Sequence, residues 1–157
     1  MPKPILYIHI ASGMAGMAVA LVAFAARKGG RLHAAAGKIY FVLVTVACAT
    51  AVVLTLAEWD ELWPFAFIAV ATYGFAVAGF LARHARTRRG LLVHVVGLTA
   101  SFGGMVIASV VNNFQRVTGI ALPFAARLLP MQFLSTCVMV WIAVLVYRGR
   151  IPRRYPT

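Results

Sequence analysis

The four histidines are the side chains of this chain whose chemistry best fits a cofactor site. His9, His33, His84 and His94 each lie in or at the end of a long apolar stretch. An ionisable residue inside a membrane-spanning stretch is costly and usually faces the interior of a helix bundle. Imidazole is a common axial ligand for haem iron, and two histidines on different helices are the least that a b-type haem requires. The sharpest cofactor hypothesis is therefore a haem held by His33 and His94.

The depth of each histidine in its apolar stretch decides which of them could meet. His9 and His94 enter from opposite faces of the predicted bundle. At about 1.5 Å per residue and a hydrocarbon core about 30 Å thick, they would be about 15 Å or more apart. They could not share one iron, whereas His33, His84 and His94 lie on the same side. His84 is thus a substitute ligand, and His9 is a weaker candidate.

A second interpretation needs no cofactor. His33 and His84 could be helix-end residues at the membrane interface, and His9 and His94 could form hydrogen bonds that hold neighbouring helices together. A proton relay, a quinone site or a metal site also stays open as a role for these side chains.

Other kinds of chemistry have little support in the sequence. The three acidic residues, Glu58, Asp60 and Glu61, fall in one short turn, so no apolar stretch contains a carboxylate for a cation-coupled carrier. Cys48 and Cys137 have no Cys or His at metal-ligand spacing, and we predict that both are small core residues. No phosphate-binding glycine pattern and no nucleophile elbow occurs. We assign no catalytic residue and no metal centre, and the sequence disfavours an enzyme.

The composition indicates which elements must position the histidines. Hydrophobic residues make up 62% of the chain and charged residues 11%, against about 25% charged in a soluble domain. A transmembrane helix needs about 20 mostly apolar residues, and five stretches qualify. The sequence predicts an all-α bundle that forms a single transmembrane domain over residues 1–157, with spans at about 4–26, 32–57, 62–82, 91–111 and 131–147.

The connection between the fourth and fifth spans is the long one. We predict that residues 112–130 form an extramembrane segment on the outer side, packed as an interfacial element or cap. Asn112, Asn113 and Gln115 make a polar cluster at its start. This cluster could be a small binding mouth or could serve only helix capping.

The basic residues predict the orientation and the location of the chain. Twelve of the fifteen Lys and Arg residues fall in the first and third connections and in the basic tail, 148–157, which must share one side. Cytoplasmic segments are enriched in Lys and Arg, so we expect an outside N-terminus, a cytoplasmic C-terminus and a bacterial inner membrane. Anionic lipids are the expected partners of the cytoplasmic face. The net charge of +12 does not indicate nucleic-acid binding, because the basic residues sit in short clusters between apolar spans.

Small residues predict how the spans pack. Ser12, Gly16 and Ala20 form a stripe on the first span, and Gly97 and Ser101 begin one on the fourth. Such stripes allow close contact between helices in lipid, so we expect the first and fourth spans to be well buried. The fifth span is poorest in glycine. We expect it at the periphery, facing lipid, a second copy or a larger complex.

Three short motifs resemble one family. They are His9-Ile10-x-x-Gly13, Arg31-Leu32-His33-x-x-x-Gly37-Lys38-x-Tyr40 and His94-x-x-Gly97-Leu98-x-x-Ser101, with Asn113 and Leu122-Pro123 downstream. The order resembles predicted bacterial membrane proteins of the DUF2306 type. The resemblance implies a small helical membrane protein without an established activity, in which His9, His33 and His94 are motif residues and His84 is not. Residues 83–90 are richer in arginine than that pattern.

The sequence therefore favours a non-enzymatic accessory or structural membrane component. The alternative is a redox membrane protein that holds a haem or a quinone near the cytoplasmic side through His33 and His94. A small-solute carrier is disfavoured by the missing membrane carboxylates and by the lack of an inverted repeat.

Overall fold

The computed structural model describes residues 2–84 and 87–148. Its elements are α1 (Lys3–Ala25), α2 (Arg31–Ala57), α3 (Trp59–Leu81), the short 3-10 turn η1 (Ala82–His84), α4 (Arg88–Thr118) and α5 (Phe124–Tyr147). No strand occurs in these two ranges. Each of the five α-helices is long and apolar enough to cross a membrane. The all-α prediction with five spans is confirmed, and the chain is a multi-pass membrane protein.

The helices begin and end at residues with a clear local reason. The Oγ of Thr87 accepts a hydrogen bond from the backbone N of Gly90 and caps the start of α4. Gly119 ends the same helix with a φ of 72°, in the left-handed region that glycine adopts without strain. Asp60 and Glu61 occupy the first turn of α3, where negative charge complements the helix dipole.

Four helix boundaries differ from the hydropathy prediction by three residues or more, and one of them is the start of α4, at Arg88 instead of residue 91. The third helix begins at Trp59 instead of residue 62, so Pro64 lies inside it. The long extramembrane segment is not a separate element, since α4 continues through residues 112–118 and α5 already begins at Phe124. Only residues 119–123 connect the two helices. Polar residues ended the predicted spans, but they do not end a helix.

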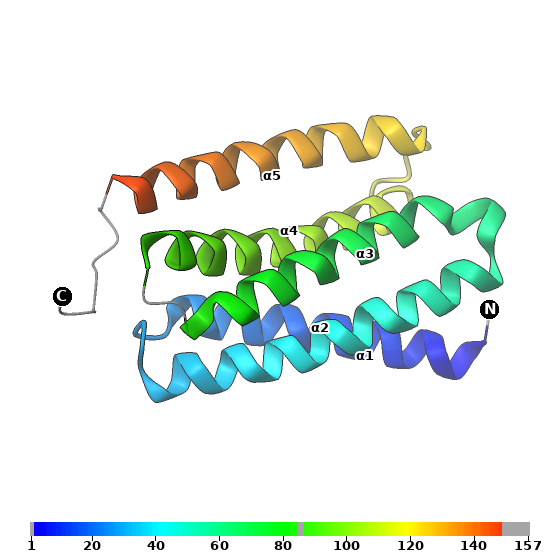
Figure 1. The fold of residues 1–157 in the computed structure, drawn as a ribbon. Coiled ribbons are helices and arrows are strands. Elements are labelled where there is room, and N and C mark those ends of the chain that lie inside the picture. The colour runs from blue at the N-terminus through cyan, green and yellow to red at the C-terminus, as the bar shows by residue number, and fades with distance from the viewer. Residues whose placement is uncertain (1, 85–86, 149–157) are drawn as a thin grey trace.

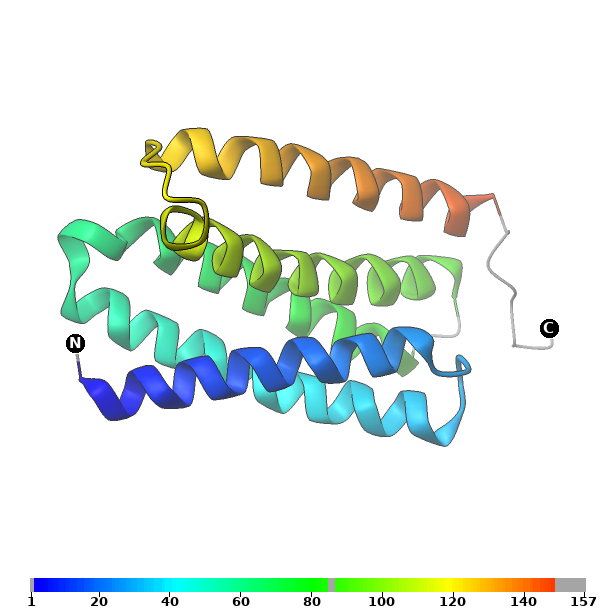
Figure 2. The same cartoon turned by 180° about the vertical axis from the view of Figure 1, so that it is seen from behind.

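The first four helices run up and down in chain order and form a four-helix bundle (Figure 1). Helix α2 packs against α1 and α3, and α4 packs against α3, with a smaller contact to α1. Helices α2 and α4 are consequently diagonal partners across the bundle. Among the described residues, helix α5 packs mainly on α4, with one aromatic contact to α3, and it stands outside the bundle, as Figures 1 and 2 both show.

The two ends of the bundle differ in charge, because one collects most of the basic residues and the other all three acidic residues. We call one the basic end, because the α1–α2 turn, η1 and the start of α4 bring Arg27, Lys28, Arg83 and Arg88 there. We call the opposite end the acidic end. It contains the acidic residues near the α2–α3 turn, and the α4–α5 connection lies at the same end. The basic positions at Arg86 and in the tail from Arg150 onward lie outside the described residues.

The core consists mainly of small side chains. Val44, Ala76, Ser101 and Val111 have no exposed surface, and the predicted stripe of Ser12, Gly16 and Ala20 is buried. The stripe on α4 is buried at Gly97 and Ser101. The expectation that the first and fourth spans are the well-buried ones is wrong, because α2 has the largest buried share. Helix α2 lies between α1 and α3 and packs along both of them, which buries more of its surface.

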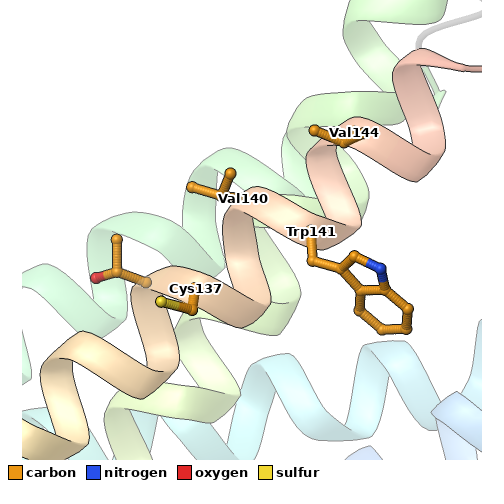
Figure 3. Close-up of a pocket in the computed structure, with 5 residues that line it drawn as sticks. Cys137, Val140, Trp141 and Val144 are labelled. Carbon is orange, nitrogen blue, oxygen red and sulfur yellow. The ribbon is translucent and has the colours of Figure 1, made fainter.

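Helix α5 is the peripheral helix, as predicted. Val146 is its one buried residue. Its outward face carries Thr136, Cys137, Val140, Trp141 and Val144 around an open apolar groove (Figure 3). Cys137 is exposed there, which corrects its prediction as a core residue, whereas Cys48 is buried as expected.

Candidate histidine site

His33 lies in the first turn of α2 and is half-buried. Its Nδ1 is 2.9 Å from the carbonyl oxygen of Ala23 in the last turn of α1. The last carbonyls of a helix have no partner within that helix. The end of α1 therefore offers an acceptor at the point where the chain turns back into α2, and His33 uses it.

His94 repeats this arrangement on the other half of the bundle. It lies in the second turn of α4, and its Nδ1 is 2.9 Å from the carbonyl oxygen of Gly79 in the last turn of α3. The backbones approach closely here. A Cβ added at Gly97 would lie 2.8 Å from the backbone N of Gly79. The glycine pair thus brings α3 and α4 close enough for His94 to reach this carbonyl.

The two hydrogen bonds determine the tautomer of both rings. A carbonyl oxygen only accepts, so each Nδ1 carries the proton and donates it. In the neutral imidazole the Nε2 atom then holds a free lone pair. Among the described residues, neither Nε2 has a hydrogen-bond partner. Histidines that ligate a metal usually present one nitrogen to the metal and donate the other N–H to a carbonyl or carboxylate.

The fold brings the two rings together. The ring centroids of His33 and His94 are 6.3 Å apart, and their planes cross at 78°. They come from the diagonal helices α2 and α4, so the pair spans the interior of the bundle near its basic end. This geometry confirms the prediction that these two histidines could come together.

A polar contact lies two turns deeper on the same two helices. Tyr40 follows His33 by seven residues, and Ser101 follows His94 by seven. Their hydroxyl oxygens are 2.8 Å apart, and both side chains are buried. Between these layers, a Cβ added at Gly37 would have no heavy atom within 4 Å. There is open space beside α2 at this glycine.

Positive charge surrounds the site at the basic end. Lys28 and Arg83 lie close enough to His94 to interact with it electrostatically. The Nζ of Lys28 also donates to the carbonyl oxygens of Ala23 and Phe24, and the guanidinium of Arg83 donates to the carbonyl oxygen of Phe80. These cations are held by helix-end carbonyls beside the histidines.

The other two histidines do not join the pair. The Nδ1 of His9 is 3.0 Å from the carbonyl oxygen of Ala47 and 3.2 Å from the Oγ1 of Thr50, so His9 links α1 to α2 towards the acidic end. This fits the interpretation of His9 as a helix-packing residue. His84 is exposed in η1. In the part of the chain that the structure describes, no three His, Cys, Asp or Glu side chains gather as a metal site.

The sequence missed the partners of the two histidines. The sequence motifs already contain Tyr40 and Ser101, each seven residues after its histidine and so on the same helix face, but they do not predict the contact between the two hydroxyls. The carbonyls of Ala23 and Gly79 had no signal in the sequence, because a backbone acceptor is independent of residue type.

Comparison with known proteins does not identify the chain. No family model, no curated protein and no solved structure matches it. The resemblance to the DUF2306 type stays a prediction.

Proposed function

We propose that this protein is a redox membrane protein that holds a b-type haem between His33 and His94. One observation carries the proposal. Both rings donate Nδ1–H to a helix-end carbonyl, both Nε2 atoms are left without a partner, and the rings lie side by side across the bundle. The distance between the rings supports this reading but is not sufficient alone.

The residues present fit an iron porphyrin better than a bare metal ion. The ring centroids of His33 and His94 are 6.3 Å apart, which is compatible with one metal held by a nitrogen of each ring at about 2.0 Å. Direct packing of aromatic rings covers a similar range, about 4.5–7 Å, so the hydrogen-bond pattern decides. A structural zinc ion needs four protein ligands, and no third ligand lies with the pair in the described residues. A haem needs two, because the porphyrin supplies the other four nitrogens.

The side chains around the pair have separate roles in this proposal. A bound haem supplies one-electron chemistry. His33 and His94 would hold the haem iron, and the carbonyls of Ala23 and Gly79 fix the tautomer and orientation of the two rings. Lys28 and Arg83 would provide positive charge at the basic end for the carboxylate groups of the haem. The edge-to-face pair of Phe24 and Phe102, with centroids 5.3 Å apart, adds apolar surface between α1 and α4.

A quinone is a poorer occupant of the same place. A quinone oxygen needs a hydrogen-bond donor, whereas both Nδ1–H groups already donate to the backbone. The neutral Nε2 atoms can only accept. The same two bonds that suit iron ligation therefore disfavour a quinone at the histidine pair.

A second candidate function rests on α5. We propose that an accessory role in a larger membrane assembly would use the outward face of this helix, since α5 packs mainly on α4 and exposes Trp141 and Val140. This role is compatible with a haem in the bundle. The cellular setting proposed for both functions is the bacterial inner membrane, with the basic end in the cytoplasm, and the proposed family is the DUF2306 type.

The proposal is tested by a visible absorption spectrum. The protein is expressed with ample haem, purified in detergent, and measured oxidised and then reduced with dithionite. We expect a Soret band and an α-band that sharpens on reduction, as a haem with two histidine ligands gives. A featureless spectrum from folded protein would overturn the haem proposal.

A further inference from the structure

A second cavity lies at the acidic end, far along the bundle from the histidine pair. It has a volume of about 400 Å³ and is formed where the first turns of α3 and α5 meet the end of α4. Arg127, Glu61 and Asn112 are its polar lining residues, and aromatic side chains complete its wall. The haem proposal uses none of these residues.

Arg127 lines this cavity and has hydrogen-bonding groups that no described residue uses. Its Nη1 donates to the carbonyl oxygen of Val111 on α4 at 2.9 Å, which anchors the guanidinium. Its Nε is buried and has no hydrogen-bond partner. With Nη1 engaged, Nε and Nη2 form the free fork of the group. Such a fork binds a phosphate or a carboxylate with two parallel hydrogen bonds, and a buried donor without an acceptor is costly.

Glu61 brings the opposite charge to the same cavity. It lies in the first turn of α3, it is exposed, and it forms no ion pair with Arg127 within the described residues. Two opposite charges that line one cavity without neutralising each other suit a ligand that carries both charges. Asn112 adds an amide that can donate or accept.

The aromatic wall indicates where such a ligand comes from. Phe65 of α3 and Phe124 of α5 meet edge to face with centroids 5.5 Å apart. Trp63 lines the cavity and is half exposed. Tryptophan is typical of the membrane–water interface. A ligand here would have its polar group in the cavity and its apolar part along the exposed hydrophobic surface of α3 and α5.

We infer that this cavity binds the phosphoethanolamine headgroup of a phospholipid. The phosphate accepts hydrogen bonds from Nε and Nη2 of Arg127, and the primary ammonium pairs with Glu61. The bound lipid holds the starts of α3 and α5 together at the acidic end, where the aromatic contact of Phe65 with Phe124 joins these two helices.

Intrinsic fluorescence can test this inference with a single reporter. Trp59→Phe and Trp141→Phe together leave Trp63 as the sole tryptophan. Delipidated protein in detergent is titrated with dihexanoyl phosphatidylethanolamine, with the phosphatidylglycerol of equal chain length, and with free phosphoethanolamine. We expect a saturable change with phosphatidylethanolamine at about tenfold lower concentration than with phosphatidylglycerol, the order that one charge-assisted contact contributes.

Three variants in that background locate the binding groups. Arg127→Gln should abolish the response to both lipids, and Glu61→Gln should remove the preference for phosphatidylethanolamine. Arg116→Gln, an exposed change near the end of α4, should alter neither. Should Arg127→Gln fail to fold, the exposed Glu61 position still decides, since an unchanged preference in Glu61→Gln would overturn the inference. Equal responses to both lipids, or none, would overturn it too. Free phosphoethanolamine that binds as tightly as the lipid would assign the cavity to a soluble zwitterion and overturn the lipid assignment.

Discussion

At the scale of single residues, His33 and His94 form a pair, whereas His9 and His84 lie apart from it. His33 and His94 should both be needed for a haem, because each would supply one axial nitrogen. His33→Ala and His94→Ala are each expected to abolish the Soret band of the purified protein. His84→Ala should leave it intact, since His84 is exposed in η1 and apart from the pair. The measurement is the absorption spectrum at equal protein concentration.

His9→Ala is the matched control for helix packing. It removes the contacts to Ala47 and Thr50 and touches no part of the pair. We expect a lower thermal midpoint with the haem spectrum retained. A Soret band that survives His94→Ala but is lost in His84→Ala would contradict the ligand assignment.

The sequence predicted that these histidines share one end of the bundle, and one interpretation predicted a hydrogen bond from His94 to a neighbouring helix, but the sequence did not predict the acceptor of either ring. Position along an apolar span fixes depth, because each helical residue adds about 1.5 Å. Which carbonyl a ring reaches depends on how two helices cross, and this is decided by contacts such as Gly79 on Gly97. The positions of the histidines in the sequence therefore predicted that His33 and His94 could meet. They did not predict that the carbonyls of Ala23 and Gly79 would accept hydrogen bonds from the two rings.

At the scale of helices, the contact between α3 and α4 should control the site from a distance. A Cβ at Gly97 would lie 2.8 Å from the carbonyl oxygen of Phe75, a backbone atom that cannot rotate away. Gly97→Ala should therefore push α3 from α4 and lower the free energy of unfolding by about 1–3 kcal/mol. It should also weaken haem retention, because His94 would lose its bond to Gly79. Thermal unfolding followed by circular dichroism in detergent measures the first effect.

Gly74→Ala, on α3, is the control on the partner helix of this contact. A Cβ there would meet nothing within 4 Å. Because alanine favours a helix over glycine by about 1 kcal/mol, this variant should unfold at the same temperature or higher. Equal destabilisation by the two changes would show that close contact between α3 and α4 is not what Gly97 provides.

Hydropathy identified the number and type of the helices but misjudged where the last two meet. Asn112, Asn113 and Arg116 lower the mean hydropathy and so ended the predicted span. They are polar but compatible with a helix, and the side-chain amide of Asn113 simply donates to the carbonyl oxygen of Ser109 one turn back. The helix ends only at Gly119, whose positive φ stops it. A hydropathy window measures burial in lipid, whereas helix ends depend on backbone caps.

At the scale of the whole molecule, the charge asymmetry predicts the orientation of the bundle. A reporter fused after Thr157 should give a cytoplasmic signal, and one fused after Gly119 of a shortened chain should give a periplasmic signal. The basic end would then face the cytoplasm, in line with the enrichment of Lys and Arg on that side. A periplasmic signal from the fusion after Thr157 would reverse the proposed orientation.

The bundle and its peripheral helix should be separable in function. Both paired histidines and their carbonyl partners belong to α1–α4, whereas Arg127 and Phe124 of the acidic-end cavity belong to α5. A chain that ends after Pro123 should therefore keep the haem spectrum and lose the response to phosphatidylethanolamine.

The haem spectrum of the shortened chain reports on the four-helix bundle, and its response to phosphatidylethanolamine reports on the acidic-end cavity. Helix α5 buries a single residue, so its removal leaves the core of Val44, Ala76 and Val111 in place. The cation–π contact between Arg88 and Tyr147, with the guanidinium carbon 4.6 Å from the ring centroid, is the one link from α5 to the basic end that the described residues show besides helix packing. Arg88→Gln in the full chain removes this link alone. If the shortened chain inserts but loses the haem spectrum while Arg88→Gln keeps it, then packing of α5 on α4 supports the histidine site, and the four-helix bundle is not the functional unit.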